Sequence, residues 1–419
     1  MEEIMFNFKN KLSPNLKYAL DNYLYEKYRV IIKCSTLLER IEKKISNSKC
    51  EIIRTIPSLN CTCALINRRL IERLIEYPQV SYIDFDTFAF SIPCDVTEIN
   101  LEKENLYLSK VIDTNNNFEL NGKNITIGLI STGLYPNKDL IKPENRIIKC
   151  IDLINGFSHA YDDNGMGTFV GGIIGGNGFC SEGNIKGVAP RCNFYSIKAF
   201  NKNGKGYISD ILYSLYLLEK DLINFNIKVI YLPFELFENN KFILTLFQES
   251  FNVLANKGVT LIVPSGSNEG SKNTIKGIST LNNIICVGGL SSIKPSEMFK
   301  FSSCGPCYRK RKPDFLAPCC NIYTLFMNIN YIPEKDNIKL YAPHLSTNYV
   351  KINCSACAGA YYAGICALLY EHRNDLTIKD IYSLLKLSST ELDMPKELQN
   401  HGMVYVKDLT LPKANKKKV

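Results

Sequence analysis

Histidine is scarce in this 419-residue chain, and tryptophan is absent. The histidines are only four, His159, His344, His372 and His401, which leaves little material for imidazole chemistry. No run of about 18 apolar residues occurs, which argues against a membrane-spanning helix. The opening sequence MEEIMFNFKNKLSPNL starts acidic and lacks the continuous apolar core of a secretory signal. We therefore expect no signal peptide, no membrane span and an intracellular location.

The composition is that of an ordinary globular protein, with 45% hydrophobic and 22% charged residues. The length has room for two or three domains. The 50 basic and 41 acidic residues give a net charge of +9, part of it in the tail 413–418 and part in the run 309–312. No zinc-finger, homeodomain or RNA-binding signature accompanies these charges, so we do not expect a nucleic-acid partner.

Cysteine, in contrast, is abundant. Sixteen cysteines in a chain without a secretory signal predict reduced, buried thiols. Cys304 and Cys307 form a CxxC pair, and Cys319 and Cys320 follow twelve residues later. The set resembles a four-thiolate zinc site only loosely, because adjacent cysteines rarely share one tetrahedral ion. We expect small buried side chains, no metal and no cofactor.

The N-terminal part of the chain predicts a small domain of its own. A helical leader (1–27) precedes apolar segments at 28–34, 52–56, 61–66 and 80–85, which predict strands. Helical spacing between them, from Leu37 to Ile45 and from Arg69 to Tyr77, completes a βαββαβ order over residues 28–92. A polar linker is expected over residues 93–105.

A second, larger domain is predicted from residue 106 to residue 408, followed by a basic tail over 409–419. Short apolar strands alternate with helices through this region. Strands are expected at 125–130, 229–232, 259–263 and 284–287, and helices at 208–225, 241–257 and 358–372. Such alternation predicts an α/β fold with an open, largely parallel sheet flanked by helices.

Four segments of the large domain resemble the subtilisin-like serine proteases. They are ITIGLISTGL (125–134), DDNGMGTFVGGIIGG (162–176), LIVPSGSNEG (261–270) and INCSACAGAYYAGICALL (352–369). Shorter matches lie between them in the family's order: GVAP (187–190), NGKG (203–206), SSCGP (302–306) and KPDFLAP (312–318). The resemblance implies a subtilisin-like parallel sheet, preceded by a ferredoxin-like propeptide domain whose C-terminal end occupies the active-site cleft.

The resemblance also places the catalytic triad. In this family an Asp orients a His, and the His takes a proton from the nucleophilic Ser. Carried over, the Asp position is Ser131, the His position is Met166 and the Ser position is Ala356. The oxyanion position retains Asn268. All three triad positions are therefore degenerate.

The nucleophile position depends on the register of the last segment. The family's serine stands eight residues before a helical glycine preceded by alanine. Counting back from Gly364 gives Ala356, so Ser355 replaces a threonine and Cys354 replaces a glycine.

The resemblance places the substrate groove at Gly204 and Gly206 on one side and at Pro233, Phe234 and Glu235 on the other. Proline removes a backbone donor, and the next two residues add bulk. Binding of a substrate in the usual mode is not expected, although the narrowed groove can still hold the chain's own propeptide end.

Other residues could in principle rescue catalysis. His159 lies seven residues before Met166, and Cys354 and Cys357 flank the nucleophile position. The alternative interpretation is structural: His159 is a histidine in a surface loop, and Cys354 and Cys357 are small buried side chains. Asp162 and Asp163 match acidic residues of the family and also suit the start of a helix.

The resemblance therefore implies a pseudoprotease with an attached propeptide. Its composition is similar to that of the clostridial germination-type subtilases, which implies a regulatory role, spore association, and an active subtilase or signalling protein as partner. The alternative is an intracellular serine-type peptidase with residual or unconventional activity.

Overall fold

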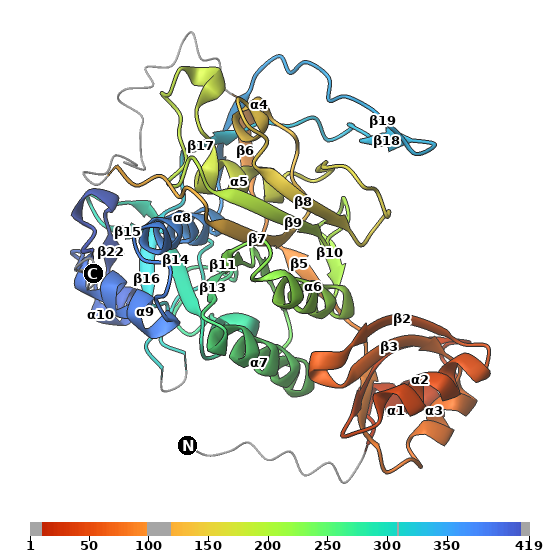
Figure 1. Ribbon diagram of the computed structural model, residues 1–419. Helices are drawn as coiled ribbons and strands as arrows, with labels where there is room; N and C mark the ends of the chain where they lie inside the picture. Colours follow the sequence, from red (N-terminus) through yellow and green to blue (C-terminus); the bar gives the residue numbers. More distant parts are fainter. Residues whose placement is uncertain (1–10, 99–118, 308–309, 412–419) are drawn as a thin grey trace, which may run out of the picture. The chain divides into compact units, whose positions relative to one another are not determined.

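The computed structural model describes residues 11–98, 119–307 and 310–411 (Figure 1). The chain divides into two compact units. One comprises Met1–Phe88 with Tyr207–Leu217 and Lys241–Ser250, and the other comprises Ala89–Gly206, Leu218–Asn240 and Phe251–Val419. The N-terminal stretch of the first unit ends at Phe88, whereas the sequence predicts a boundary at residue 92.

The N-terminal unit contains an antiparallel sheet of order β2-β3-β1-β4. Its elements are α1 (Pro14–Asp21), β1 (Tyr28–Cys34), α2 (Leu38–Asn47), β2 (Glu51–Ile56), a 3-10 turn (Pro57–Leu59), β3 (Cys61–Ile66), α3 (Arg68–Leu74) and β4 (Val80–Phe85). From β1 onward this is the predicted βαββαβ order.

Local sequence explains these elements. Helix α2 turns Leu38, Ile41 and Ile45 into the core at helical spacing. Helix α3 ends earlier than the predicted Tyr77, because Tyr77 precedes Pro78 and the residue before proline disfavours helical geometry.

The larger unit is built on a ten-stranded sheet of order β21-β22-β16-β14-β13-β11-β7-β9-β8, with β15 paired to β14. All pairs are parallel except β14–β15 and β21–β22. The strands are β7 (Thr126–Ser131), β8 (Ile147–Asp152), β9 (Asn193–Lys198), β11 (Ile227–Tyr231), β13 (Thr260–Pro264), β14 (Ile285–Ser292), β15 (Glu297–Met298), β16 (Phe315–Pro318), β21 (Ser389–Thr390) and β22 (Met403–Val404). Strands β7 and β13 are buried at every residue, as parallel strands covered on both faces require.

Two buried helices, α5 (Met166–Gly175) and α8 (Ala356–His372), pack against each other, and α8 lies along β11, β13, β14 and β16. Small residues permit this close approach: a Cβ on Gly364 would lie 2.4 Å from the Cβ of Val188. The other helices are α4 (Lys138–Ile141), α6 (Ile208–Asp221), α7 (Lys241–Asn256), α9 (Ile378–Leu387) and α10 (Lys396–Gln399), with 3-10 turns at Phe179–Ser181, Gly277–Thr280 and Val406–Asp408.

Three small sheets complete the fold, with orders β10-β5-β12, β17-β20-β6 and β18-β19. Their strands are β5 (Phe88–Ser91), β6 (Asp95–Glu98), β10 (Lys205–Tyr207), β12 (Phe234–Glu235), β17 (Ile322–Leu325), β18 (Glu334–Lys335), β19 (Ile338–Lys339) and β20 (Tyr349–Asn353). Strand β6 lies within the segment expected to be a polar linker. Residues 99–105 of that segment lie outside the described residues, as do residues 1–10 of the leader and 412–419 of the tail.

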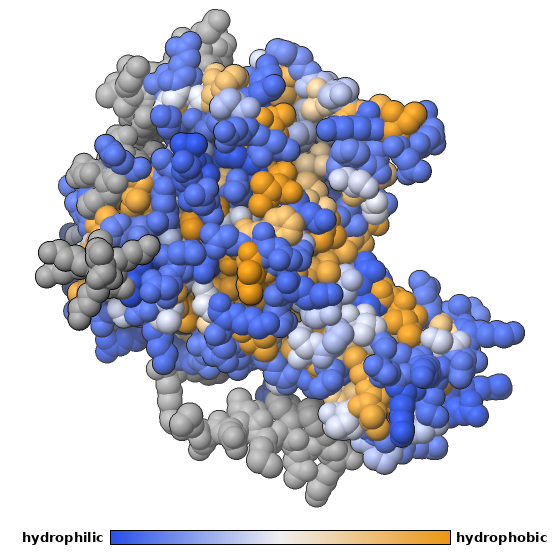
Figure 2. Space-filling view, in the orientation of Figure 1, coloured by the Kyte–Doolittle hydropathy of each residue, from blue (hydrophilic) through white to orange (hydrophobic). Residues whose placement is uncertain are grey.

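The face of the molecule in Figure 2 is mainly hydrophilic, with hydrophobic residues scattered across it. Among the described residues, none of the helices combines the length and the apolar character needed to cross a bilayer.

Candidate functional site

Three chain segments meet where the sequence predicts the triad positions. Ser131 ends β7, Met166 begins α5 and Ala356 begins α8. The hydroxyl of Thr132 accepts a hydrogen bond from the backbone N–H of Gly167 at 3.0 Å, which fastens the turn after β7 to the start of α5. The packing of α5 on α8 brings in the third segment.

Close backbone contact at this junction explains one of its glycines. Gly133 has φ +110°, and a Cβ there would lie 2.1 Å from the carbonyl oxygen of Tyr161. The glycine is therefore required by the shape of the turn, independently of any reaction.

The triad corner is buried; we use this name for Ser131, Met166, Ser355 and Ala356. Met166 is 2% exposed, and Ala356 is fully buried. The hydroxyls of Ser131 and Ser355 are buried and have no hydrogen-bond partner within the described part of the chain. A thioether and a methyl group supply neither a base nor a nucleophile there.

The acidic residues before α5 have structural partners. The carboxylate of Asp162 accepts hydrogen bonds from the backbone N–H groups of Gly165 at 2.8 Å and Thr168 at 2.9 Å. Asp163 forms an ion pair with the buried Lys198 at 2.5 Å. Lys198 also donates to the carbonyl oxygen of Thr132 at 2.7 Å. These contacts stabilise the backbone around the start of α5.

The oxyanion corner, defined here as Glu235, Ser267, Asn268 and Ser303, is polar and closely hydrogen-bonded. The buried Glu235 carboxylate accepts from the backbone N–H of Ser267 at 2.8 Å and from the Ser267 hydroxyl. The side-chain amide of Asn268 lies 3.4 Å from Glu235 Oε2 and 3.4 Å from Ser303 Oγ. The donor at the oxyanion position is thus directed at a resident carboxylate.

The predicted groove holds a strand of the same chain. Strand β5 is central in the sheet β10-β5-β12. The backbone N–H of Ser91 donates to the carbonyl of Gly204 at 2.8 Å, and on the other side Ser91 pairs with Phe234 and Phe90 pairs with Glu235. Both predicted walls therefore flank residues 90–91. Gly206 is needed for packing, because a Cβ there would lie 2.5 Å from the carbonyl oxygen of Ala199.

Beyond the groove, the chain is joined covalently to the segment before α8. Cys94 forms a disulfide bond with Cys354, with the two Cα atoms 4.7 Å apart. Strand β6 then pairs antiparallel with β20, Asp95 opposite Asn353. The expectation that all cysteines are reduced is wrong for this pair, because the fold brings together residues 260 positions apart in sequence. The remaining fourteen cysteines are free thiols in the described residues.

The other candidates from the sequence have structural surroundings that explain them without a catalytic role. The ring of His159 lies 2.7 Å from the carboxylate of Glu334 and is one third exposed. Cys354 is held in the disulfide, and burial raises the pKa of the Cys357 thiol. Within the described chain, no three His, Cys, Asp or Glu side chains gather as metal ligands, Cys304, Cys307, Cys319 and Cys320 included.

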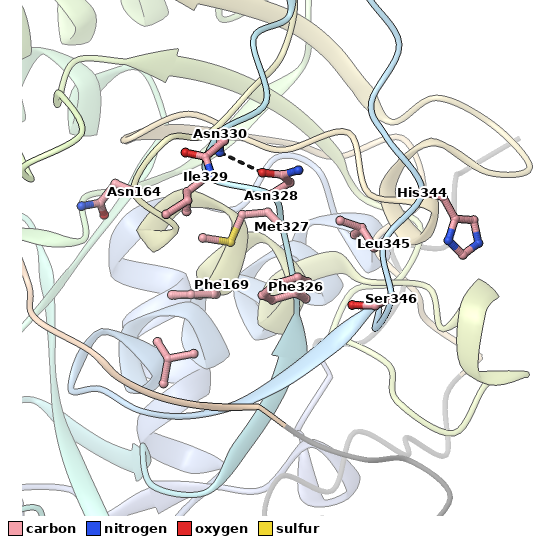
Figure 3. A pocket seen from close by; sticks show the side chains of 11 residues that line it. Asn164, Phe169, Phe326, Met327, Asn328, Ile329, Asn330, His344, Leu345 and Ser346 are labelled. Carbon is pink, nitrogen blue, oxygen red and sulfur yellow. Dashed lines mark hydrogen bonds between the residues drawn. The ribbon is translucent and has the colours of Figure 1, made fainter.

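Sequence reasoning missed a cavity of about 510 Å³ beside the start of α5. Its lining is Val96, Asn164, Phe169, Phe326, Met327, Asn328, Ile329, Asn330, His344, Leu345 and Ser346. Figure 3 shows Met327 between the rings of Phe169 and Phe326 and the side chain of Asn328, with His344 standing apart. The long segment between β17 and β20 supplies most of the lining. The length of this segment is the one feature of the sequence that could have indicated the cavity.

Comparison with known families gives one extended match. The model described as "Subtilase family", Peptidase_S8, matches residues 122–404. Among curated proteins, the chain is 29% identical over 283 residues to "Serine protease AprX" of Bacillus subtilis (strain 168), covering 64% of this chain and 61% of that protein. It is 24% identical to "Minor extracellular protease Epr" of the same organism, covering 69% of this chain and 43% of that protein. The chain thus spans about two fifths to three fifths of the length of these relatives.

Solved structures share the fold. Fervidolysin from Fervidobacterium pennivorans, a keratinolytic enzyme related to subtilisin, aligns over 93% of this chain and 62% of its own, with a TM-score of 0.69 and 16% identity. A mutant of the epidermin leader peptide processing serine protease from Staphylococcus aureus aligns over 93% of this chain and 100% of its own, with a TM-score of 0.69 and 17% identity.

Proposed function

Because the chain belongs to the subtilase family, we propose that it is a pseudoprotease that keeps the protease fold for regulatory binding. The observation that carries the proposal is the identity of the first residues of α5 and α8, Met166 and Ala356. The family requires a proton-transferring histidine at the first position and a nucleophilic serine at the second.

The size of the expected loss of catalytic rate supports this proposal. In subtilisin, removal of the triad lowers kcat by about 10⁶-fold. An oxyanion hole and substrate binding alone leave a rate enhancement of about 10³- to 10⁴-fold over the reaction in water. Here the Asn268 amide is also directed at Glu235, so its charge-stabilising contribution is compromised as well.

The occupied groove supports a binding role that does not consume a substrate. Residues 90–91 take the central position of the sheet β10-β5-β12. We propose that the N-terminal unit acts as a retained propeptide. The protein would then control an active subtilase or a signalling protein, and the specific process that we propose is spore germination. The location proposed is intracellular, cytoplasmic or spore-associated.

A second candidate is an intracellular serine-type peptidase with residual activity. It is favoured by the retained Asn268 and by relatives whose names describe serine proteases. The two functions differ in what the purified protein does to itself and to peptides.

The deciding measurement is the intact mass of the recombinant protein, purified without added protease. We expect one full-length chain and no hydrolysis of peptide substrates. A cut near Ile92, or hydrolysis that disappears in the Asn268→Ala variant, would establish the peptidase instead. Co-purification of an active subtilase from the native cell would support the regulatory role.

A further inference from the structure

The Cys94–Cys354 bond lies between the predicted groove and the predicted nucleophile position in the larger unit. Cys354 directly follows β20 and stands two residues before Ala356, at the start of α8. Cys94 directly precedes β6, three residues after the end of β5. The bond therefore joins the strand that leaves the groove to the segment that carries the nucleophile position.

Without this bond, the segment 88–98 is held by short backbone ladders and by the packing of a few side chains, such as the buried Ala89 and Ile92. Strand β5 spans four residues, and β12, one of its partners, spans two. Strand β6 also spans four residues and pairs with β20 over 95–98. Such short ladders open readily compared with the core strands of a sheet, because few hydrogen bonds must break together.

The two cysteines differ in exposure. Cys354 is fully buried, whereas Cys94 is only partly buried, between the exposed Pro93 and the exposed Asp95. A reductant from solution therefore reaches the Cys94 sulfur first. Breaking the bond at that side requires no opening of the core around α8.

We propose that Cys94–Cys354 is a redox-controlled latch that keeps β5 in the groove and β6 on β20 when oxidised, and frees residues 88–98 when reduced by a dithiol. One thiolate of the dithiol attacks Sγ of Cys94, forms a mixed disulfide and expels Cys354 as a thiolate, which takes up a proton. The second thiol then displaces Cys94, which leaves as a thiol. Two electrons and two protons pass to the cysteines, and the dithiol becomes a cyclic disulfide. The latch is independent of whether the protein cleaves peptides.

A neighbouring thiol must be controlled in any test. The backbone N–H of Cys354 donates to the carbonyl of Cys319 at 2.8 Å, so the adjacent cysteines 319 and 320 border the bond. A hydrogen bond from Cys319 lowers the pKa of the Cys320 thiol. Experiments are therefore run in parallel in a Cys320→Ser background, in which Cys320 cannot exchange with the latch.

The test is hydrogen–deuterium exchange of the full-length protein, followed by mass spectrometry, with and without dithiothreitol. Peptide mapping without reductant is expected to recover residues 94 and 354 in one cross-linked peptide. On reduction, we expect amides of 88–98 to exchange at least about 10-fold faster, while β1 and β13 stay protected. The Cys94→Ser variant should show the fast exchange without reductant and no further response to it.

The matched control is Cys50→Ser, which removes a partly buried thiol with no disulfide partner. This variant should keep the full response to dithiothreitol. Equal protection of 88–98 in the oxidised and reduced protein, or absence of the cross-linked peptide after air oxidation, would overturn the latch.

Discussion

The oxyanion corner and the triad corner adjoin the same predicted site but are built in opposite ways. Around Glu235, donors and acceptors satisfy one another: Ser267 and Asn268 both direct N–H groups at its carboxylate. Around Ala356, the hydroxyls of Ser131 and Ser355 are buried without hydrogen-bond partners in the described structure.

The difference lies in how the polar groups are paired. In the triad corner, two buried hydroxyls have no hydrogen-bond partner in the described structure, and an unpaired buried hydroxyl destabilises a fold. In the oxyanion corner, the Glu235 carboxylate on β12 is integrated into hydrogen bonds with Ser267. Under the proposed function, the first corner is therefore the one in which substitutions can introduce catalytic groups, whereas the second is already occupied by a carboxylate.

The largest expected effect comes from repairing both corners. We predict that Ser131→Asp, Met166→His and Ala356→Ser together give little self-cleavage, because Glu235 still engages the oxyanion amide. Adding Glu235→Gly should raise the cleavage rate by about 10²–10³-fold, the contribution of one oxyanion donor. The rate is measured by intact mass over time.

The expected cut in the fourfold variant lies between residues 91 and 94, the segment that joins β5 to the disulfide. Adding Asn268→Ala to the fourfold variant should abolish the gain. Equal cleavage with and without Glu235→Gly would show that the oxyanion corner is not blocked, and the comparison between the corners would fail.

A smaller effect is expected on stability at the oxyanion corner. Glu235→Ala leaves the backbone N–H and hydroxyl of Ser267 without their acceptor and leaves the Asn268 amide with Ser303 alone, and should lower the free energy of unfolding by about 2–4 kcal/mol. Urea unfolding followed by circular dichroism measures this change. The exposed Glu238→Ala serves as the matched control and should change stability by less than about 0.5 kcal/mol. A Glu235→Ala variant with an unchanged free energy of unfolding would contradict the integrated network.

The smallest effect should have the opposite sign. Ser131→Ala and Ser355→Ala each remove a buried hydroxyl that has no partner, so we expect a change between zero and about 1 kcal/mol in favour of the folded state. Ser279→Ala is the matched control, because the Ser279 hydroxyl donates to the Pro264 carbonyl at 2.8 Å, and its loss should destabilise by about 1 kcal/mol. Destabilisation by both test variants would reveal hydrogen bonds at the triad corner.

Much of the fold could be predicted from periodicity. Strands β1 and β4 begin and end at the predicted residues, because alternating apolar side chains bounded by polar turns have one favourable conformation. The ordered family motifs also led to three segments that contact one another, although the catalytic positions assigned to them stay predictions. Local pattern and motif order are the signals that a sequence carries directly.

The misses share a different cause. The pairing of Cys94 with Cys354 joins residues 260 positions apart, and no local pattern signals it. The Glu235 carboxylate was predicted to add bulk, but its hydrogen bonds to Ser267 depend on a side-chain direction set by tertiary packing. Strand β6 exists because β20 offers it an edge, so its own polar sequence indicated a linker.

The position of β5 in the groove has a consequence for any competing molecule. A tethered occupant is present at an effective concentration that, for short flexible connections, is on the order of millimolar. A free peptide of equal intrinsic affinity must therefore reach millimolar levels before it displaces half of the resident strand. Peptides that occur at lower concentrations leave this groove closed, and a partner that opens it must bring contacts that β5 does not make.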